Sequence, residues 1–267
     1  DVLDIEGLIS SPPGAGRVKH LQEVLDAYEH DFPALQRRSE KFPTPQSLRA
    51  FVKQGASSAA PEKGWSEPTE GSEWIISRAK AKDERPLWIL VWGSITDVAQ
   101  AVHDDPSIKP KLRIHSIGSW NTQQDRAARD YLFDKHPDLW WIESDTTFRG
   151  MYMGGQQDGE GGNRSFVEQH VRHHGALGEL FFQKKRDIKM GDTPSLLYLL
   201  RGDPDDPTTE HWGGRFSKSD RNNNFWTDAP DKDLSDSGRA GAKTVNRWRQ
   251  AYLNDWRKRM DWAAETR

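Results

Sequence analysis

The apolar positions of the chain form short runs that alternate with stretches of helical spacing. Runs typical of buried strands are flanked by turn residues, and they lie at Val2–Ile9, Leu87–Trp92, Leu112–Ile117 and Leu139–Ile142. Because strands that alternate with helices pair in parallel through right-handed crossovers, we expect these four in one sheet. The pattern therefore predicts a three-layer α/β fold, with a mostly parallel sheet and helices on both faces.

The helices are predicted from apolar residues that recur every three or four positions. The clearest early example has Val18, Leu21, Val24, Leu25 and Tyr28 on one face. Cap residues and spacing predict further helices at Thr44–Lys53, from Ser72, and at Ile95–Val102, Asp125–Lys135, Ser165–His174 and Thr193–Leu200. The segment Ala56–Gly71 is a long loop, predicted to be either mobile or lid-like.

The second half of the chain is less regular. Gly202–Gly241 is long, polar and poor in apolar residues, whereas Thr244–Ala264 reads as a strong final helix. Its periodic stripe predicts packing rather than a binding surface, and consists of Val245, Trp248, Tyr252, Trp256, Met260 and Ala263. No Pro- or Gly-rich linker separates two cores, so residues 1–267 are predicted to form a single domain.

Composition excludes several classes of function. The net charge of −3 gives no indication of a nucleic-acid partner. No apolar run approaches the roughly 18 residues of a membrane span, so no membrane partner is expected. The absence of cysteine excludes disulfides and thiolate metal sites. Hydrophobic residues make up only 34% of the chain but include 12 tryptophans, which indicates aromatic core packing or surfaces on which sugars stack.

Candidate chemistry is expected where parallel strands end, because ligands of open α/β sheets bind beyond the carboxyl ends. The turns there are Ser10–Gly16, Gly93–Asp97, Gly118–Asp125 and Asp145–Gly150, and Gly191-Asp192 at a helix start is added to them. We expect these segments to converge at one edge. The alternative for each is a plain connector, in which Thr96, Asp125 or Asp192 only caps its helix.

Taken together, the motifs resemble the nucleoside hydrolase superfamily. The closer resemblance is to the nucleoside-hydrolase-like domain of the cellulose-binding protein family, and it spans essentially the whole chain. The residues that support it are "LDIEGLIS", "SEWIISRAKAKDERPLWILVWGSITDVAQAV", "FRGMYMGG", "MGDTPSLLYLL", "HWGGRF" and "VNRWRQAYLNDWRKRMDW". The resemblance implies metal-assisted hydrolysis of a glycosidic bond in a nucleoside or sugar, with calcium as cofactor. It also implies an extracellular or periplasmic location.

The resemblance assigns roles to individual residues. Trp92, in "WGSITDVAQA", matches the position whose backbone carbonyl binds calcium in nucleoside hydrolases, and Asp192 matches a calcium-binding aspartate. Asn121 matches an asparagine that binds the ribose hydroxyls, and Ser119 stands where the superfamily has a glutamate. Gly191 replaces the histidine thought to protonate the leaving base.

The largest departure from the superfamily lies at the front of the sequence. Nucleoside hydrolases begin with a strand that ends in a cluster of aspartates, whereas this sequence starts at what would be the second strand. Asp1 and Asp4 do not occupy the missing positions. One carboxylate and one carbonyl are too few oxygens for tight calcium binding. The alternative function is therefore a non-catalytic carbohydrate-binding domain on the same scaffold, with a small sugar, nucleoside or glycan as ligand.

Four further features are weaker candidates. Trp212 and Arg215 in "HWGGRF" combine a stacking face with a charged donor, although such pairs also pack interiors. Glu143 and Asp145 form an acid pair or a turn cap at a strand end. His170 and His174 have a spacing that binds metal but no third ligand nearby, and Asp203–Pro207 is typical of a solvated turn.

Overall fold

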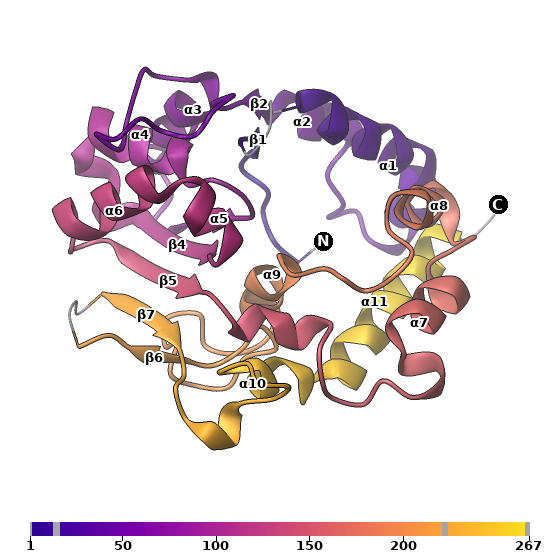
Figure 1. Ribbon diagram of the computed structural model, residues 1–267. Helices are drawn as coiled ribbons and strands as arrows, with labels where there is room; N and C mark the ends of the chain where they lie inside the picture. Colours follow the sequence, from indigo (N-terminus) through magenta and orange to yellow (C-terminus); the bar gives the residue numbers. More distant parts are fainter. Residues whose placement is uncertain (1, 13–16, 221–223, 265–267) are drawn as a thin grey trace.

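The protein contains a five-stranded sheet (Figure 1), in a computed structural model that describes residues 2–12, 17–220 and 224–264. The strand order is β3-β4-β5-β7-β6. Four strands are parallel and the edge strand β6 is antiparallel; the bounds are β3 Leu87–Val91, β4 Leu112–Ile117, β5 Trp140–Ser144, β7 Phe225–Asp228 and β6 Phe216–Lys218. The predicted mostly parallel sheet is therefore confirmed.

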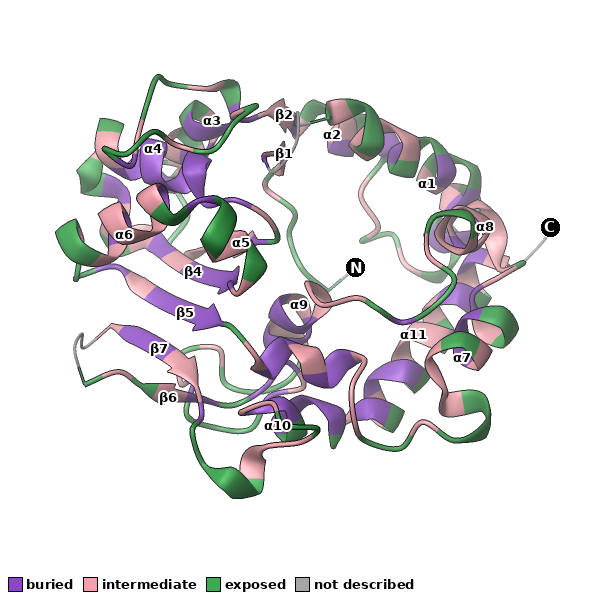
Figure 2. Cartoon of the chain, in the orientation of Figure 1, coloured by how far each residue is buried: buried purple, intermediate pink, exposed green. Residues whose placement is uncertain are grey.

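Alternate residues of the central strands pack on opposite faces of this sheet. Leu112, Ile114 and Trp141 belong to one core cluster, which is covered by α3 (Glu70–Ala79), α4 (Thr96–Asp104) and α6 (Arg126–Lys135). On the opposite face His115 and Ile142 are buried beside Tyr198 of α9 (Thr193–Leu200). Figure 2 shows the buried interiors of β4, β5 and α4 between these layers. Helices on both faces of the sheet confirm the predicted three layers.

The first strand does not join the central sheet. Of the predicted strand Val2–Ile9, only Leu8 and Ile9 lie in an observed strand, β1 (Leu8–Ser10), which pairs in parallel with β2 (Val52–Gln54) in a separate two-stranded sheet. The prediction that this strand lies in the main sheet was therefore wrong. The predicted helix Thr44–Lys53 was wrong at its end for the same reason. Helix α2 spans Pro45–Ala50, because the residues after it pair with β1.

Six further α-helices complete the described part of the fold. They are α1 (Val18–Arg38), α5 (Trp120–Gln124), α7 (Asn163–His170), α8 (Gly175–Lys184), α10 (Ala242–Asn246) and α11 (Arg249–Ala264), with short 3-10 helices η1 (Pro106–Lys111), η2 (Thr147–Met151), η3 (Gly159–Gly161) and η4 (Lys232–Leu234). The predicted final helix is divided into α10 and α11. Its stripe packs in a second core that includes Val245, Tyr252 and Met260, which confirms the predicted packing role.

The loop between β2 and α3 is fastened to the helices beneath it by three buried side chains. The backbone N–H of Ala56 donates to Asp97 Oδ1 at 2.9 Å, and that of Ala60 donates to Asp125 Oδ1 at 3.1 Å. A third bond joins the N–H of Ser66 to Gln100 Oε1 at 2.7 Å. Asp125 therefore ties the loop down and accepts from Thr96 Oγ1 at 2.7 Å, and its side chain makes no capping hydrogen bond.

Candidate functional site

Strands β3, β4 and β5 end side by side. Val91 pairs in register with Ser116, and Ile117 pairs with Ser144, so the turns that follow all leave the same edge of the sheet. We refer to this edge, with the segments Trp92–Thr96, Gly118–Asn121, Asp145–Tyr152 and Gly191–Ser195, as the carboxyl edge. It is the position at which open parallel sheets bind ligands.

The start of α9 is joined directly to the end of β3. The indole N–H of Trp92 donates to Ser195 Oγ at 2.8 Å, and this hydroxyl donates to the backbone carbonyl of Asp192 at 2.8 Å. On the other side of β3, Ser11 Oγ donates to the carbonyl of Ser94 at 3.4 Å. The structure thus places the segments of Ser11, Trp92 and Asp192 together; residues 13–16 of the predicted first turn lie outside the described residues.

Ser119 lies at the same edge in a strained backbone conformation. Its φ is 58°, in a region that residues other than glycine seldom adopt, and such strain is typical of ligand-binding turns. Surrounding groups hold it in place: its N–H donates to Asp145 Oδ1 at 2.5 Å, and its hydroxyl accepts from Arg149 at 3.1 Å. Arg149 also contacts the hydroxyl of Tyr152 at 3.3 Å.

The segment Phe148–Tyr152 contacts both Ser119, through Arg149, and Gly191, the residue before Asp192. The rings of Phe148 and Tyr152 lie against Gly191, where a Cβ atom would come within 3.0 Å of the Phe148 ring and 3.5 Å of the Tyr152 ring. A histidine at this position would have to displace Phe148. The space beside Gly191 is therefore filled by aromatic rings, and Ser119 and Asp192 lie at one edge although 73 positions separate them in the sequence.

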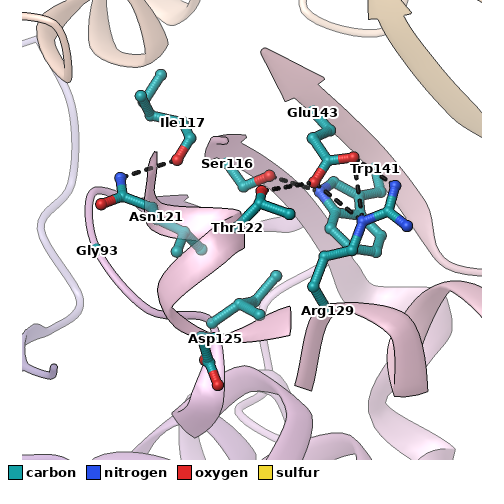
Figure 3. A pocket seen from close by; sticks show the side chains of 11 residues that line it. Gly93, Ser116, Ile117, Asn121, Thr122, Asp125, Arg129, Trp141 and Glu143 are labelled. Carbon is teal, nitrogen blue, oxygen red and sulfur yellow. Dashed lines mark hydrogen bonds and ion pairs between the residues drawn. The ribbon is translucent and has the colours of Figure 1, made fainter. Parts of the chain in front are cut away.

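The side chain of Asn121, in α5, is hydrogen-bonded to the end of the preceding strand β4. Its side-chain amide donates to the carbonyl of Ile117 at 2.9 Å (Figure 3), and it lines a small cavity together with Gly93, Thr122 and Glu143. The cavity volume is about 10 Å³, which is room for one water molecule and not for a sugar. The ligand-binding role of Asn121 stays a prediction.

Asp192 does not cap α9. It occupies the N-cap position with helical dihedral angles, and its side chain makes no capping hydrogen bond. Among the described residues, none donates a hydrogen bond to this half-buried carboxyl group. Burial raises the pKa of Asp192 to about 6, and the positive charge of Lys185 opposes the rise. The capping alternative is therefore wrong for this residue.

Glu143 and Asp145 have different environments. Glu143 is buried and paired with Arg129 at 2.5 Å, and it accepts from Thr122 Oγ1 at 3.1 Å (Figure 3). Burial raises the pKa of Glu143, and Arg129 opposes the rise. Asp145 is exposed and holds the strained turn at Ser119. Of the predicted acid pair, only Asp145 is open to a ligand at the carboxyl edge.

The other predicted binding pair flanks Gly213 and Gly214, which pack against Pro194 of α9 and Thr147 of η2. Trp212 packs in the second core, its backbone N–H donates to the carbonyl of Arg201 after the end of α9, and the Arg201 guanidinium lies 5.5 Å from its ring. Arg215 is exposed, and its backbone N–H donates to Thr244 Oγ1 at 3.0 Å. No described contact joins either residue to Asp192 or Ser119, so their binding role stays a prediction.

Comparison with known proteins identifies the family of this chain. The family described as "Cellulose-binding Sde182, nucleoside hydrolase-like domain" matches residues 1–216. The chain belongs to this family. A nucleoside hydrolase-related hypothetical protein from Saccharophagus degradans, described as associated with carbohydrate metabolism, has a similar solved structure. The sequence identity is 25%, and the TM-score is 0.75 over 98% of this chain and 65% of that one.

The chain thus spans about two thirds of the length of that solved relative. Among curated proteins, none matches significantly. The family resemblance seen in the sequence and the α/β fold are both confirmed by these comparisons. No helix in the described part of the chain is long and apolar enough to span a membrane.

The donor set of this nucleoside hydrolase-like chain does not fit calcium. Within residues 2–12, 17–220 and 224–264, no three histidine or acidic side chains are grouped so that they could hold a metal ion. The predicted ligands amount to one carboxylate, from Asp192, and one carbonyl, from Trp92, whereas calcium takes six to eight oxygens. His170 and His174 are paired separately with Glu160 at 3.5 Å and Asp261 at 3.3 Å.

Three residues of the site were missed by sequence reasoning. Arg149 and Trp120 lie on the carboxyl edge, within predicted turns in which other residues were named as candidates. Asp228, at the end of β7, accepts from the backbone N–H groups of Asp145, Thr146 and Thr147 at 3.1, 2.8 and 2.9 Å. Asp228 could have been found from the motif "NFWTD", in which an aspartate follows a short apolar run.

Proposed function

We propose that this nucleoside hydrolase-like chain binds a carbohydrate at its carboxyl edge. The observation on which the proposal rests is the Asp192 carboxyl group, which lies half-buried at the edge without a hydrogen bond from a described residue. A carboxylate in this state is an acceptor for the hydroxyl groups of a sugar, and such charge-assisted bonds are stronger than neutral ones. The cellulose-binding description of the family supports the same ligand class.

Neighbouring groups add the donors and acceptors that a polyhydroxylated ligand needs. Arg149 and the Tyr152 hydroxyl supply donors beside Ser119, and the exposed Asp145 supplies an acceptor. These side chains hold one another in place, so the binding geometry is formed before the ligand arrives. Binding then costs less conformational entropy than it would on a mobile loop.

Hydrolysis of a glycosidic bond is the second candidate, and the raised pKa of Asp192, to about 6, favours it. A protonated Asp192 would donate its proton to the leaving oxygen as the bond from that oxygen to the anomeric carbon breaks. Water would add to the anomeric carbon, and a carboxylate such as Asp145 would take up the proton that the water loses. We place this candidate second because Asp145 is already engaged by Ser119.

Calorimetric titration with cellohexaose tests the binding proposal. We expect Asp192→Asn to weaken binding by about tenfold, because the isosteric amide removes the charge that strengthens the sugar bonds. Asp187→Asn is the matched control, an exposed aspartate that precedes Asp192 in the same connection, and it should leave the affinity unchanged. Equal affinities of wild type and Asp192→Asn would contradict the proposal.

A turnover assay separates the two candidates. Wild-type protein is incubated with cellohexaose and with inosine, and the release of reducing ends or free base is measured. We expect binding without turnover. Turnover that Asp192→Asn abolishes would establish the second candidate instead.

A further inference from the structure

Two tryptophans differ from the other ten. All twelve lie in the described residues, yet only Trp92 and Trp120 are more than half exposed, at 51% and 55%. The others pack in the cores or against neighbouring rings and cations, as Trp65 does on His103 and Lys63. Neither Trp92 nor Trp120 stacks on an aromatic ring or a cation in the described chain. A single exposed apolar side chain is ordinary, whereas apolar surface gathered at one place marks an interaction site, so the positions of these two indoles decide their significance.

Both exposed indoles stand on the carboxyl edge. Trp92 directly follows β3, and Trp120 lies three residues beyond the end of the neighbouring strand β4, as the first residue of α5. Figure 1 shows α5 beside the tip of β4, with α9 on the other side of the same strand end. Val91 pairs with Ser116, so the two tryptophans follow neighbouring strand ends about 4.8 Å apart, on turns that leave the same edge.

The two indoles are held in different ways. The N–H of Trp92 is fixed by Ser195 Oγ at 2.8 Å, so its ring has a set orientation while half of its surface stays open. The Trp120 side chain makes no described hydrogen bond, ring contact or cation contact, and it follows Ser119, whose φ is positive. The fold thus maintains an exposed aromatic side chain at each of two adjacent strand ends.

The shape of the edge distinguishes between small and extended ligands. A small molecule such as a nucleoside usually has most of its surface buried in an enclosed pocket. The cavity behind Asn121 is about 10 Å³ and cannot enclose one. A larger cavity of about 450 Å³ lies under the Ala56–Thr69 loop, and no aromatic side chain lines it. The exposed faces of Trp92 and Trp120 are open to a ligand that lies along the edge.

We propose that Trp92 and Trp120 form a platform on which successive pyranose rings of an extended glycan stack. The apolar C–H faces of a pyranose pack on indole faces, while its hydroxyl groups point sideways toward Asp192, Arg149 and Tyr152. The platform rests on the proposed carbohydrate-binding function and specifies a chain of sugars instead of a single sugar or nucleoside.

The test measures how the affinity for cello-oligosaccharides depends on their length and on the removal of each tryptophan ring. Wild-type protein is titrated with cellobiose, cellotetraose and cellohexaose, and we expect the affinity to rise by at least about tenfold across the series. Trp120→Ala should weaken cellohexaose binding by roughly tenfold without loss of folding, because this side chain is more than half exposed and makes no described hydrogen bond or ring contact. Trp92→Phe keeps a ring and should weaken it less. Trp262→Ala, on a half-buried tryptophan of α11, is the control.

The outcomes separate this inference from the proposed function. If wild-type protein binds cellohexaose and Trp120→Ala binds it equally well, the platform is wrong and the binding function stands. An affinity that is independent of chain length also contradicts the platform. If wild-type protein binds no cello-oligosaccharide, both proposals fail. If Trp120→Ala instead abolishes self-association and leaves glycan affinity unchanged, the exposed rings serve a protein contact and the platform is overturned.

Discussion

The indole N–H of Trp92 donates to Ser195 Oγ at 2.8 Å and joins two segments that are 103 positions apart in the sequence. This bond fixes the first turn of α9 against the end of β3. Trp92→Phe keeps the ring but removes the donor, and Ser195 still has the carbonyl of Asp192 as acceptor. We expect a loss of about 1 kcal/mol in the free energy of unfolding, measured by urea denaturation.

A double-mutant cycle with Ser195→Ala is the control for this prediction. If the bond accounts for the loss, the two substitutions are coupled by about 0.5–1.5 kcal/mol. Additive effects would show that Trp92 contributes only through packing.

The carboxyl group of Asp192 makes stability depend on pH. Burial raises its pKa from the ordinary value of 3.8 to about 6, so the folded chain binds this proton more tightly than the unfolded chain. The stabilisation of the folded chain by the proton on Asp192 is fully present below pH 3.8 and is lost as the pH rises through 6. Relative to wild type, Asp192→Asn should therefore gain stability between pH 4 and pH 7, by at most about 3 kcal/mol.

Urea denaturation of both proteins at pH 4 and pH 7 measures this difference. Asp187→Asn controls for the general effect of removing one negative charge. A difference between wild type and Asp192→Asn that stays constant across the range would show that Asp192 has an ordinary pKa in the folded chain.

The central sheet was predictable because β3, β4 and β5 are apolar runs long enough to recognise. Strands β1, β2, β6 and β7 have only three or four residues each. Such short segments are extended because a neighbour pairs with them, and the pairing partner is distant in the sequence. Val52 pairs with Leu8, and Phe225 pairs with Trp141. Local patterns cannot reveal these partners, so the separate β1–β2 sheet was missed.

The site was predictable in part for a related reason. Turns after strands can be located from the sequence, and this rule selected the segments of Trp92 and Ser119, whereas Asp192 was selected as an acidic residue at a helix start. The contacts of Arg149 with Ser119, and of Asp228 with the turn at Thr146, span 30 and 82 positions. The absence of a capping bond at Asp192 is also a matter of side-chain geometry. The segments could be predicted, whereas the contacts within them could not.

Ser119 provides a test of backbone strain at the edge. Its φ of 58° favours glycine, but its hydroxyl accepts a hydrogen bond from Arg149. Ser119→Ala and Ser119→Gly both lose that bond, and only the glycine variant relieves the strain. We expect Ser119→Gly to be more stable than Ser119→Ala by about 1 kcal/mol in thermal or urea unfolding. Equal stabilities would show that the turn is unstrained.

The buried pair of Glu143 and Arg129 should dominate the electrostatic stability of this region. The Glu143 side chain is 4% exposed, and its carboxylate lies 2.5 Å from the guanidinium. Glu143→Gln leaves the half-buried Arg129 with only the exposed Asp130 as counter-charge, so we expect a loss of about 3 kcal/mol in urea denaturation. Asp130→Asn is the matched control, because the Asp130 side chain, 42% exposed, meets the same arginine at 3.2 Å. Its removal should cost less than about 1 kcal/mol, since surface pairs contribute little. Comparable losses in the two variants would show that burial does not decide the strength of the Glu143 pair.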